Sequence, residues 1–134
     1  MWDFADSREF VLIHHFKIPR IYTWGEKEKD KREEIRRNAI ANFPDSAPRC
    51  EWYAFSIEVD RSGLERPLDI ENVPKLIVDA FSKGIIQKDK SRYPKVGLYP
   101  DDDLRHVRAF QIEGKFNNAG RNNTQVQIFG KKAR

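Results

Sequence analysis

Two carboxylates and a lysine lie within residues 69–75 of the chain. Asp69 and Glu71 are two positions apart, and side chains at this spacing point to the same side of an extended backbone. Carboxylate oxygens are ligands that Mg²⁺ prefers, so an extended segment here would let both acids bind one ion. Lys75 would then stabilise the negative charge of a phosphate. These are the groups that a magnesium-dependent phosphodiesterase requires.

A helix is predicted to begin directly after these acids. Pro74 has no amide hydrogen and is tolerated only in the first turn of a helix, so Asn72 is the expected N-cap residue. The two acids would then stand beside the positive end of the helix, which favours negative charge and bound phosphate. Lys75 and Asp79 are four positions apart and should share one helix face. Without catalysis, the acids would only complement the helix end, and Lys75 and Asp79 would form an ordinary ion pair.

Composition indicates one globular domain spanning residues 1–134. Hydrophobic residues make up 39% of the chain and charged residues 34%, a balance typical of folded proteins. No apolar run approaches the roughly 20 residues needed to cross a bilayer, and the N-terminus lacks the pattern of a signal peptide. We therefore expect a cytoplasmic protein with no membrane partner. The net charge of +4 favours an anionic partner such as nucleic acid.

Hydrophobic periodicity predicts an α+β fold of order β-α-β-α-β-β, with two helices packed on a small mixed sheet of about four strands. The expected strands are Phe10–Ile18, Glu51–Asp60, Leu104–Lys115 and Thr124–Gly130, and the expected helices are Glu26 to about Phe43 and Val73–Lys83. Gly84 would end the second helix. The second strand alternates, and its inner face is expected to carry Tyr53, Phe55, Ile57 and Val59.

The same order of elements and the motif around residue 69 resemble the RusA-type Holliday-junction resolvases. The likeness rests on Asp69-Ile70-Glu71-Asn72, then Lys75, then Asp79-Ala80-Phe81, which match that family's Asp-x-Asp-Asn-x-x-Lys-x-x-x-Asp-Ala-Leu. The resemblance implies a RusA-like fold and a homodimeric endonuclease that binds branched DNA. It also implies phosphodiester hydrolysis with Mg²⁺, for which Mn²⁺ would substitute.

Carried over by position, the resemblance assigns Asp69 and Glu71 as catalytic metal ligands and Lys75 as the residue that orients the scissile phosphate. Asn72 and Asp79 are implied to support them. The family's third acid precedes the strand that follows the helix, and here the position is open. Counting from the motif reaches Asp89, whereas matching the acidic pair before the strand reaches Asp102 and Asp103. We favour Asp103 as the catalytic ligand, then Asp102, because strand residues follow immediately.

Three features depart from the family pattern. Glu71 stands where the family has Asp, Pro74 alters the first helical turn, and the count to the third acid is irregular. These departures favour a rival hypothesis, a DNA-binding or assembly module of the same fold that lacks turnover.

Basic residues near the predicted site and at the end of the chain are candidates for contacts with DNA phosphates. The set predicted to bind DNA comprises Arg66, Arg105, Arg108, Lys131 and Lys132. Lysines and arginines within residues 26–37 alternate with acids, which is typical of a solvated helix face.

Overall fold

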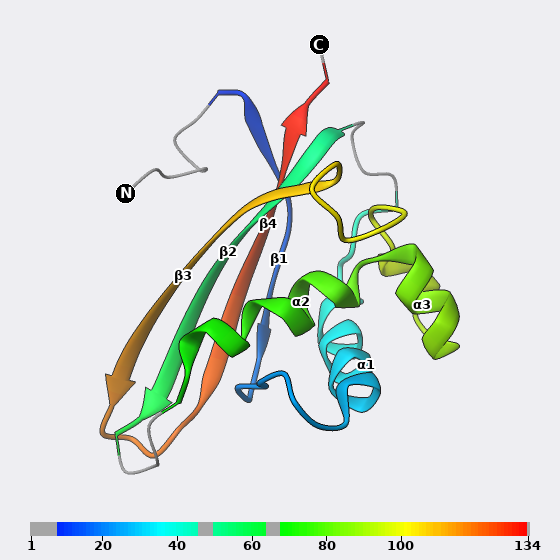
Figure 1. Ribbon diagram of the computed structural model, residues 1–134. Coiled ribbons are helices and arrows are strands. Elements are labelled where there is room, and N and C mark those ends of the chain that lie inside the picture. The colour runs from blue at the N-terminus through cyan, green and yellow to red at the C-terminus, as the bar shows by residue number, and fades with distance from the viewer. Residues whose placement is uncertain (1–7, 46–49, 64–67, 134) are drawn as a thin grey trace.

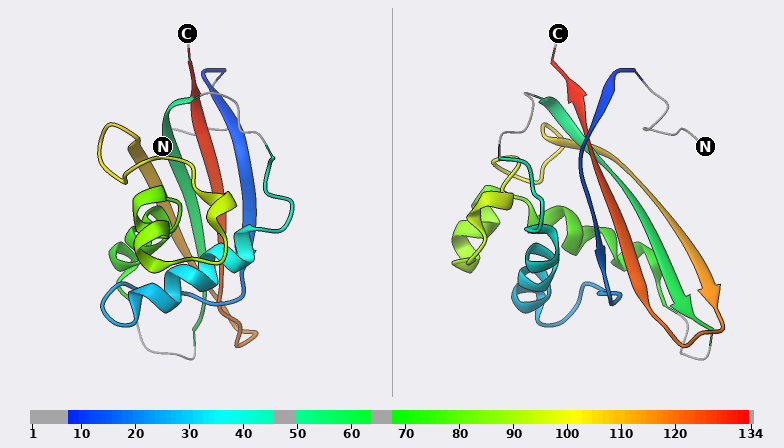
Figure 2. Two further views of the ribbon diagram at one scale, coloured as in Figure 1. Left: turned by 90° about the vertical axis from the view of Figure 1, so that its right-hand side faces the viewer. Right: turned by 180° about the vertical axis from the view of Figure 1, so that it is seen from behind.

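The computed structural model of the chain describes residues 8–45, 50–63 and 68–133. One mixed sheet of four strands carries helices on a single face (Figures 1 and 2). In chain order the elements are β1 (Phe10–Ile18), α1 (Glu28–Ala39), β2 (Cys50–Ser62), the 3-10 turn η2 (Ile70–Asn72), α2 (Pro74–Ala80), α3 (Lys83–Asp89), the 3-10 turn η3 (Pro94–Val96), β3 (Val107–Asn117) and β4 (Asn123–Lys132). Within these residues, no helix is long and apolar enough to cross a membrane. The predicted α+β class and four-stranded sheet are confirmed.

The sheet has the strand order β1-β4-β2-β3. β4 runs antiparallel to both β1 and β2, whereas β2 and β3 are parallel. A parallel pair requires a long crossover connection. The connection from β2 to β3 contains α2 and α3. The crossover therefore delivers the segment with the predicted chemistry to the helix-covered face of the sheet.

The hydrophobic core lies between this face and the helices. The predicted inner residues of β2 are all buried, and Phe55 is fully so. From the helices, Ile35 of α1 and Leu76 of α2 are fully buried in the same core. Period-two alternation in the strand and helical spacing in α1 thus identified both sides of the core.

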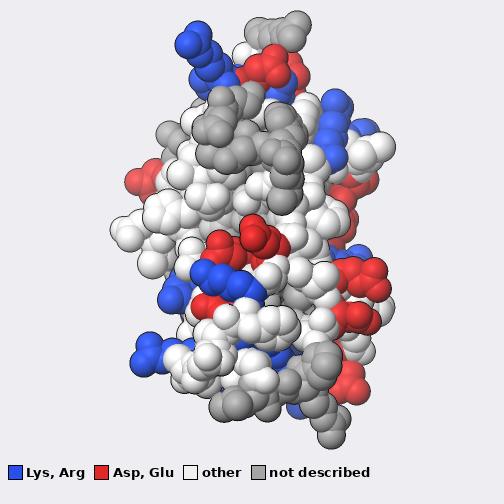
Figure 3. All heavy atoms as spheres, turned by 90° about the vertical axis from the view of Figure 1, so that its left-hand side faces the viewer, with Lys and Arg blue, Asp and Glu red and all other residues white. Residues whose placement is uncertain are grey.

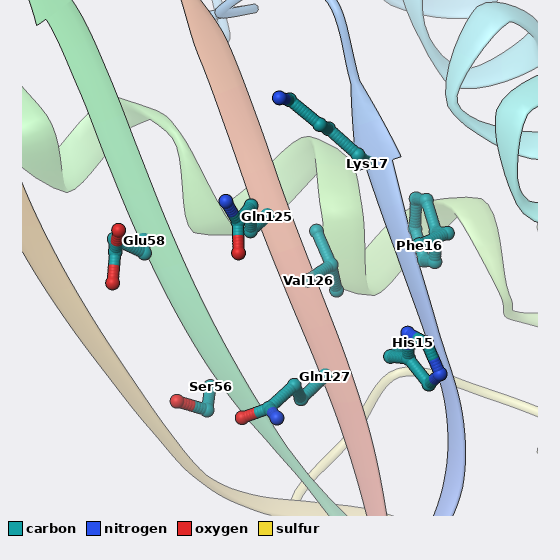
Figure 4. A pocket seen from close by; sticks show the side chains of 8 residues that line it. All are labelled: His15, Phe16, Lys17, Ser56, Glu58, Gln125, Val126 and Gln127. Carbon is teal, nitrogen blue, oxygen red and sulfur yellow. The ribbon is translucent and has the colours of Figure 1, made fainter.

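The opposite face of the sheet is largely polar over its middle, where it is hollowed. Figure 4 shows this face, with α2 running behind the sheet and polar side chains directed away from it. The lining residues are His15, Phe16, Lys17, Ser56, Glu58, Gln125, Val126 and Gln127. Phe16 and Val126 belong to the core on the helix side, so their neighbours in the strands point outward.

The predicted helix Val73–Lys83 ends early, at Ala80, and an unpredicted third helix follows it, which is a correction to the expected two-helix fold. The chain leaves the α conformation at Phe81 and Ser82, and Ser82 has extended backbone angles. The Ser82 side-chain oxygen accepts a hydrogen bond from the Ile85 amide, which caps α3. Gly84 lies in the first turn of α3, where a Cβ would approach the Pro100 carbonyl oxygen to 3.3 Å. Gly84 therefore permits a close backbone approach and does not end a helix.

A buried arginine joins all three helices. The Arg36 side chain is fully buried; its Nε donates to the Ala80 carbonyl (2.7 Å), and a terminal nitrogen donates to the Asp89 carboxylate (3.0 Å). Arg32 donates two further hydrogen bonds to Asp89, at 2.8 and 2.7 Å. Burying a charge is costly unless it is paired and hydrogen-bonded. These bonds fix the C-terminal ends of α2 and α3 to α1.

Replacing Arg36 with Met should lower the free energy of unfolding by about 3 kcal/mol or more, because the substitution removes a partner of the buried Asp89 and leaves the Ala80 carbonyl unsatisfied. Urea denaturation would measure the change. The matched control is Arg37→Met, which removes an exposed ion pair with Glu34 and should cost less than about 1 kcal/mol. Equal losses in the two variants would contradict the role given to Arg36.

Candidate active site

A hollow of about 650 Å³ opens between α2 and the start of β3. It combines charged groups with an apolar wall. The residues from the α2 side are Glu71, Pro74, Lys75, Val78 and Asp79, and those from the β3 side are Asp102, Leu104, Val107, Arg108, Ala109 and Phe110. Five of these residues are charged, and four of the five belong to the sets predicted from the motif and the acidic pair.

The break between α2 and α3 builds one wall of this hollow. Segment 98–100 bonds to the broken turn, since the Leu98 amide donates to the Phe81 carbonyl and the Lys83 amide donates to the Tyr99 carbonyl. The Tyr99 hydroxyl, fully buried, donates to the Val78 carbonyl. Tyr99 therefore holds the loop that carries Asp102 against α2, the helix that carries Asp79.

Asp79 is the most buried acid of the hollow, with 4% of its surface exposed. Lys75 Nζ lies 3.3 Å from its Oδ2 atom, as the spacing of four predicts. Its Oδ1 atom is buried and receives no hydrogen bond from a donor group in the described residues. The neighbouring group is the Asp102 carboxyl, which lies within hydrogen-bonding range. Two carboxyls can share a hydrogen bond only if one of them is protonated.

The pKa values of the two acids diverge accordingly. Burial, followed by the hydrogen bond with Asp102 and its charge, raises the pKa of Asp79 to about 7, against the opposing effect of Lys75. The hydrogen bond from Asp79 lowers the pKa of Asp102. The pair thus holds one proton up to near neutral pH, which is the expected behaviour of two carboxylates that share a site.

The predicted geometry of the first two acids is wrong. Residues 70–72 form a 3-10 turn, so side chains two positions apart diverge around the turn. Glu71 lines the hollow, whereas Asp69 precedes the turn and is exposed. The N-cap of α2 is Val73, not Asn72, and Pro74 follows it in the first turn as predicted. The Asn72 carbonyl accepts a hydrogen bond from the Trp24 amide.

The structure distinguishes the three candidates for the third acid, Asp89, Asp102 and Asp103. Asp89 is held by Arg32 and Arg36 on the far side of the helices. Asp103 accepts hydrogen bonds from Arg105 and contacts the His106 ring, and those interactions lower its pKa, the largest cause being the bond from Arg105. Asp102, the second choice from sequence, is the acid that faces Asp79.

The predicted ligands Asp69, Glu71, Asp102 and Asp103 are therefore not brought together as one set. Across the part of the chain that the structure describes, no three His, Cys, Asp or Glu side chains form a group that could hold a metal. An ion at this position would depend on the Asp79–Asp102 pair, with Glu71 at the edge of the hollow. Mg²⁺ commonly takes only one or two carboxylates and retains several waters.

Two of the arginines predicted to bind DNA lie at this end of β3. Arg108 lines the hollow, and its guanidinium lies 5.7 Å from the centroid of the Trp52 ring. Arg105 is exposed and is paired with Asp103 at 2.6 Å. Of these two arginines, Arg108 is thus the one that lines the hollow.

The other predicted DNA contacts lie elsewhere. Lys131, at the end of β4, lies 3.9 Å from Glu9. Lys132 follows it and is exposed. Arg66 lies outside the described residues.

The burial of Asp79 beside Asp102 and the apolar wall of the hollow were not predicted from the sequence. Asp79 is the one charged residue between Leu76 and Phe81, and an acid inside an apolar helical run is a signal of burial next to a partner. Leu104 and Phe110 were assigned only to a strand. They are exposed by 75% and 55%, a property that periodicity does not reveal.

Comparison with known proteins gives no match: no family model matches this chain, and no curated protein does. The roles proposed below therefore depend on the geometry of the hollow and on the motif.

Stability should fall as the pH rises from about 4 to about 7, by about 1 kcal/mol per pH unit from Asp79 alone. In that range the folded protein holds a proton on Asp79 that the unfolded chain releases, so the raised pKa stabilises the fold only at the lower pH. Asp79→Asn should remove this slope and raise stability at pH 8. Urea denaturation at pH 5 and pH 8, without divalent ions, would measure both effects.

Asp103→Asn is the matched control for this measurement. Asp103 is a half-exposed acid with a lowered pKa, so its substitution should leave the slope between pH 5 and pH 8 unchanged. A slope that persists in Asp79→Asn would show that another group causes it.

Proposed function

We propose that the protein is a magnesium-dependent endonuclease that cuts branched DNA, such as a four-way junction, and acts as a homodimer. The observation that carries the proposal is the buried Asp79 carboxyl, which faces Asp102, contacts Lys75 and has one oxygen without a hydrogen-bond partner among the described residues. The identity of the substrate follows from the resemblance of the motif to the RusA-type resolvases.

The donor set fits a hard divalent cation. Asp79 and Asp102 offer oxygen ligands, and the buried Oδ1 atom of Asp79 lacks a donor among the described residues. Glu71 lines the edge of the hollow, and waters would complete the coordination of an ion held by two carboxylates. Bound there, Mg²⁺ would lower the pKa of a coordinated water and polarise the phosphate.

The remaining roles belong to the chain itself. Lys75 is half-exposed, so its ammonium can contact a phosphate in the hollow while it remains 3.3 Å from Asp79. Arg108 lies on the opposite wall and can contact the same phosphate group or its neighbour. Two fixed cations on opposite walls would orient the phosphodiester and stabilise its developing negative charge.

A bound nucleotide would cover the exposed apolar wall and displace water from it. Leu104 and Phe110 flank the acids and would contact the sugar and base of the bound nucleotide. Excluding bulk water strengthens the electrostatic interactions of Lys75 and Arg108.

A second candidate function is a DNA-binding or assembly module without turnover. The observation that favours it is that the described residues contain no three-acid group able to hold a metal. This candidate predicts junction binding that is insensitive to divalent ions, whereas the endonuclease requires strand scission that depends on them.

Cleavage of a labelled four-way junction in Mg²⁺ would separate the two candidates. Asp102→Asn and Asp79→Asn should each lower the cleavage rate by about 100-fold or more, because each removes a carboxylate from the site. The adjacent control, Asp103→Asn, should retain activity within about three-fold, since that acid is directed to Arg105 and His106.

Two results would contradict the proposed site. Equal losses in Asp102→Asn and Asp103→Asn would show that the acids are wrongly assigned. A wild-type protein that binds the junction but does not cut it in Mg²⁺ or Mn²⁺ would establish the module without turnover.

A further inference from the structure

β3 is an edge strand. It is hydrogen-bonded to β2 on one side, and no other described strand pairs with its outer edge. Figure 1 shows β3 as the outermost strand of the sheet. Alternate backbone N–H and C=O groups of such a strand point outward and can pair with another strand.

The helix-side face of β3 is apolar and unusually exposed. Phe110, Ile112 and Phe116 alternate on this face, because each lies in register with an inward-facing position of β2. Phe116 is 75% exposed and Phe110 is 55% exposed. Gly114 completes the series, and Ile70 covers it closely enough that a Cβ would approach the Ile70 side chain to 3.2 Å. The exposed strip therefore follows the free edge.

The opposite face of β3 carries charges that are arranged about Gly114. Glu113 precedes it and Lys115 follows it, and both point away from the helices. Lys115 also forms an ion pair with Glu58 of β2 at 2.7 Å and remains 56% exposed. Figure 3, which views the molecule from the side on which β3 lies in Figure 1, shows acidic and basic groups next to one another.

We propose that the free edge of β3 pairs antiparallel with the same edge of a second copy of this chain, centred on Gly114. In this register Glu113 lies opposite Lys115 of the second copy, twice by symmetry. Phe116 lies opposite Ile112 of the second copy on the apolar face. Both contacts are favourable cross-strand pairs.

Neighbouring registers are poorer. The two apolar faces lie on the same side of the sheet only if the symmetry axis passes through a residue, so the alternative registers are centred on neighbouring residues. Centred on Glu113, the pairing would place the two Glu113 carboxylates opposite each other, and like charges in that position are destabilising. Centred on Ile112, it would place Glu113 opposite Gln111 and would lose both ion pairs. The charge pattern therefore selects the Gly114 register and a self-complementary partner.

The pairing places two copies of the hollow on one face of a continuous sheet. Ala109 lines the hollow and lies five positions from Gly114, so the two hollows would be separated by about 30 Å along the strands. A branched substrate with two strands to cut would meet both sites from the same side. This consequence depends on the proposed function, whereas the pairing itself does not.

Sedimentation equilibrium of the full chain from about 1 to 100 μM would test the pairing. The wild type should dimerise, and Glu113→Lys or Lys115→Glu alone should each weaken the dimer by at least ten-fold, because each creates like-charged pairs. The double variant should recover the wild-type association within about three-fold. Lys17→Glu, on β1 at the other edge of the sheet, is the control and should leave association unchanged.

Thermal melts of each variant would confirm that it folds. Recovery in the double variant would show that the single variants lose association through charge repulsion and not through damage to the strand. A wild type that is monomeric throughout, single reversals that leave the dimer intact, or a double variant that stays monomeric would each overturn the proposal. If the edge instead binds another protein or DNA, the purified wild type should be monomeric. A dimer that cuts junctions but ignores the single reversals would overturn only this interface, whereas a dimer that responds to them but cuts no junction would overturn only the proposed function.

Discussion

The buried Arg36 guanidinium is the constraint on which the arrangement of the helices depends. Its bonds to the Ala80 carbonyl and to Asp89 fix the ends of two short helices that have only seven residues each. Helices of this length are unstable alone and require tertiary contacts. Because Ala80 directly follows Asp79, the same bonds also fix the acid that faces the hollow.

The interruption between α2 and α3 links this framework to the site. A continuous helix would have used the backbone groups of residues 81–84 internally. The break leaves them available to segment 98–100, and Tyr99 then holds the following loop against α2. The approach of Asp102 to Asp79 is thus a consequence of where the helix stops. The cost is a buried acid with one oxygen that no described residue satisfies, a feature typical of functional sites.

The sequence predicted the strands, the core face of β2 and the Lys75–Asp79 pair, because each depends on local periodicity. It placed the end of the second helix at Lys83 and did not predict that a new helix begins there. The bonds that hold the break come from the distant segment 98–100, which local spacing does not reveal. It also misplaced Asp69, because a 3-10 turn and an extended strand are hard to distinguish over three residues. The choice between Asp102 and Asp103 depends on loop geometry, which spacing alone does not determine.

We propose that Asp79 and Asp102 together bind one divalent cation. A titration with Mn²⁺ followed by electron paramagnetic resonance, at pH 8 and without DNA, tests it most directly. The account predicts one bound ion per chain in the wild type and in Asp103→Asn, and loss of that ion in both Asp79→Asn and Asp102→Asn. Unchanged binding in the last two variants, or no binding in the wild type, would contradict it.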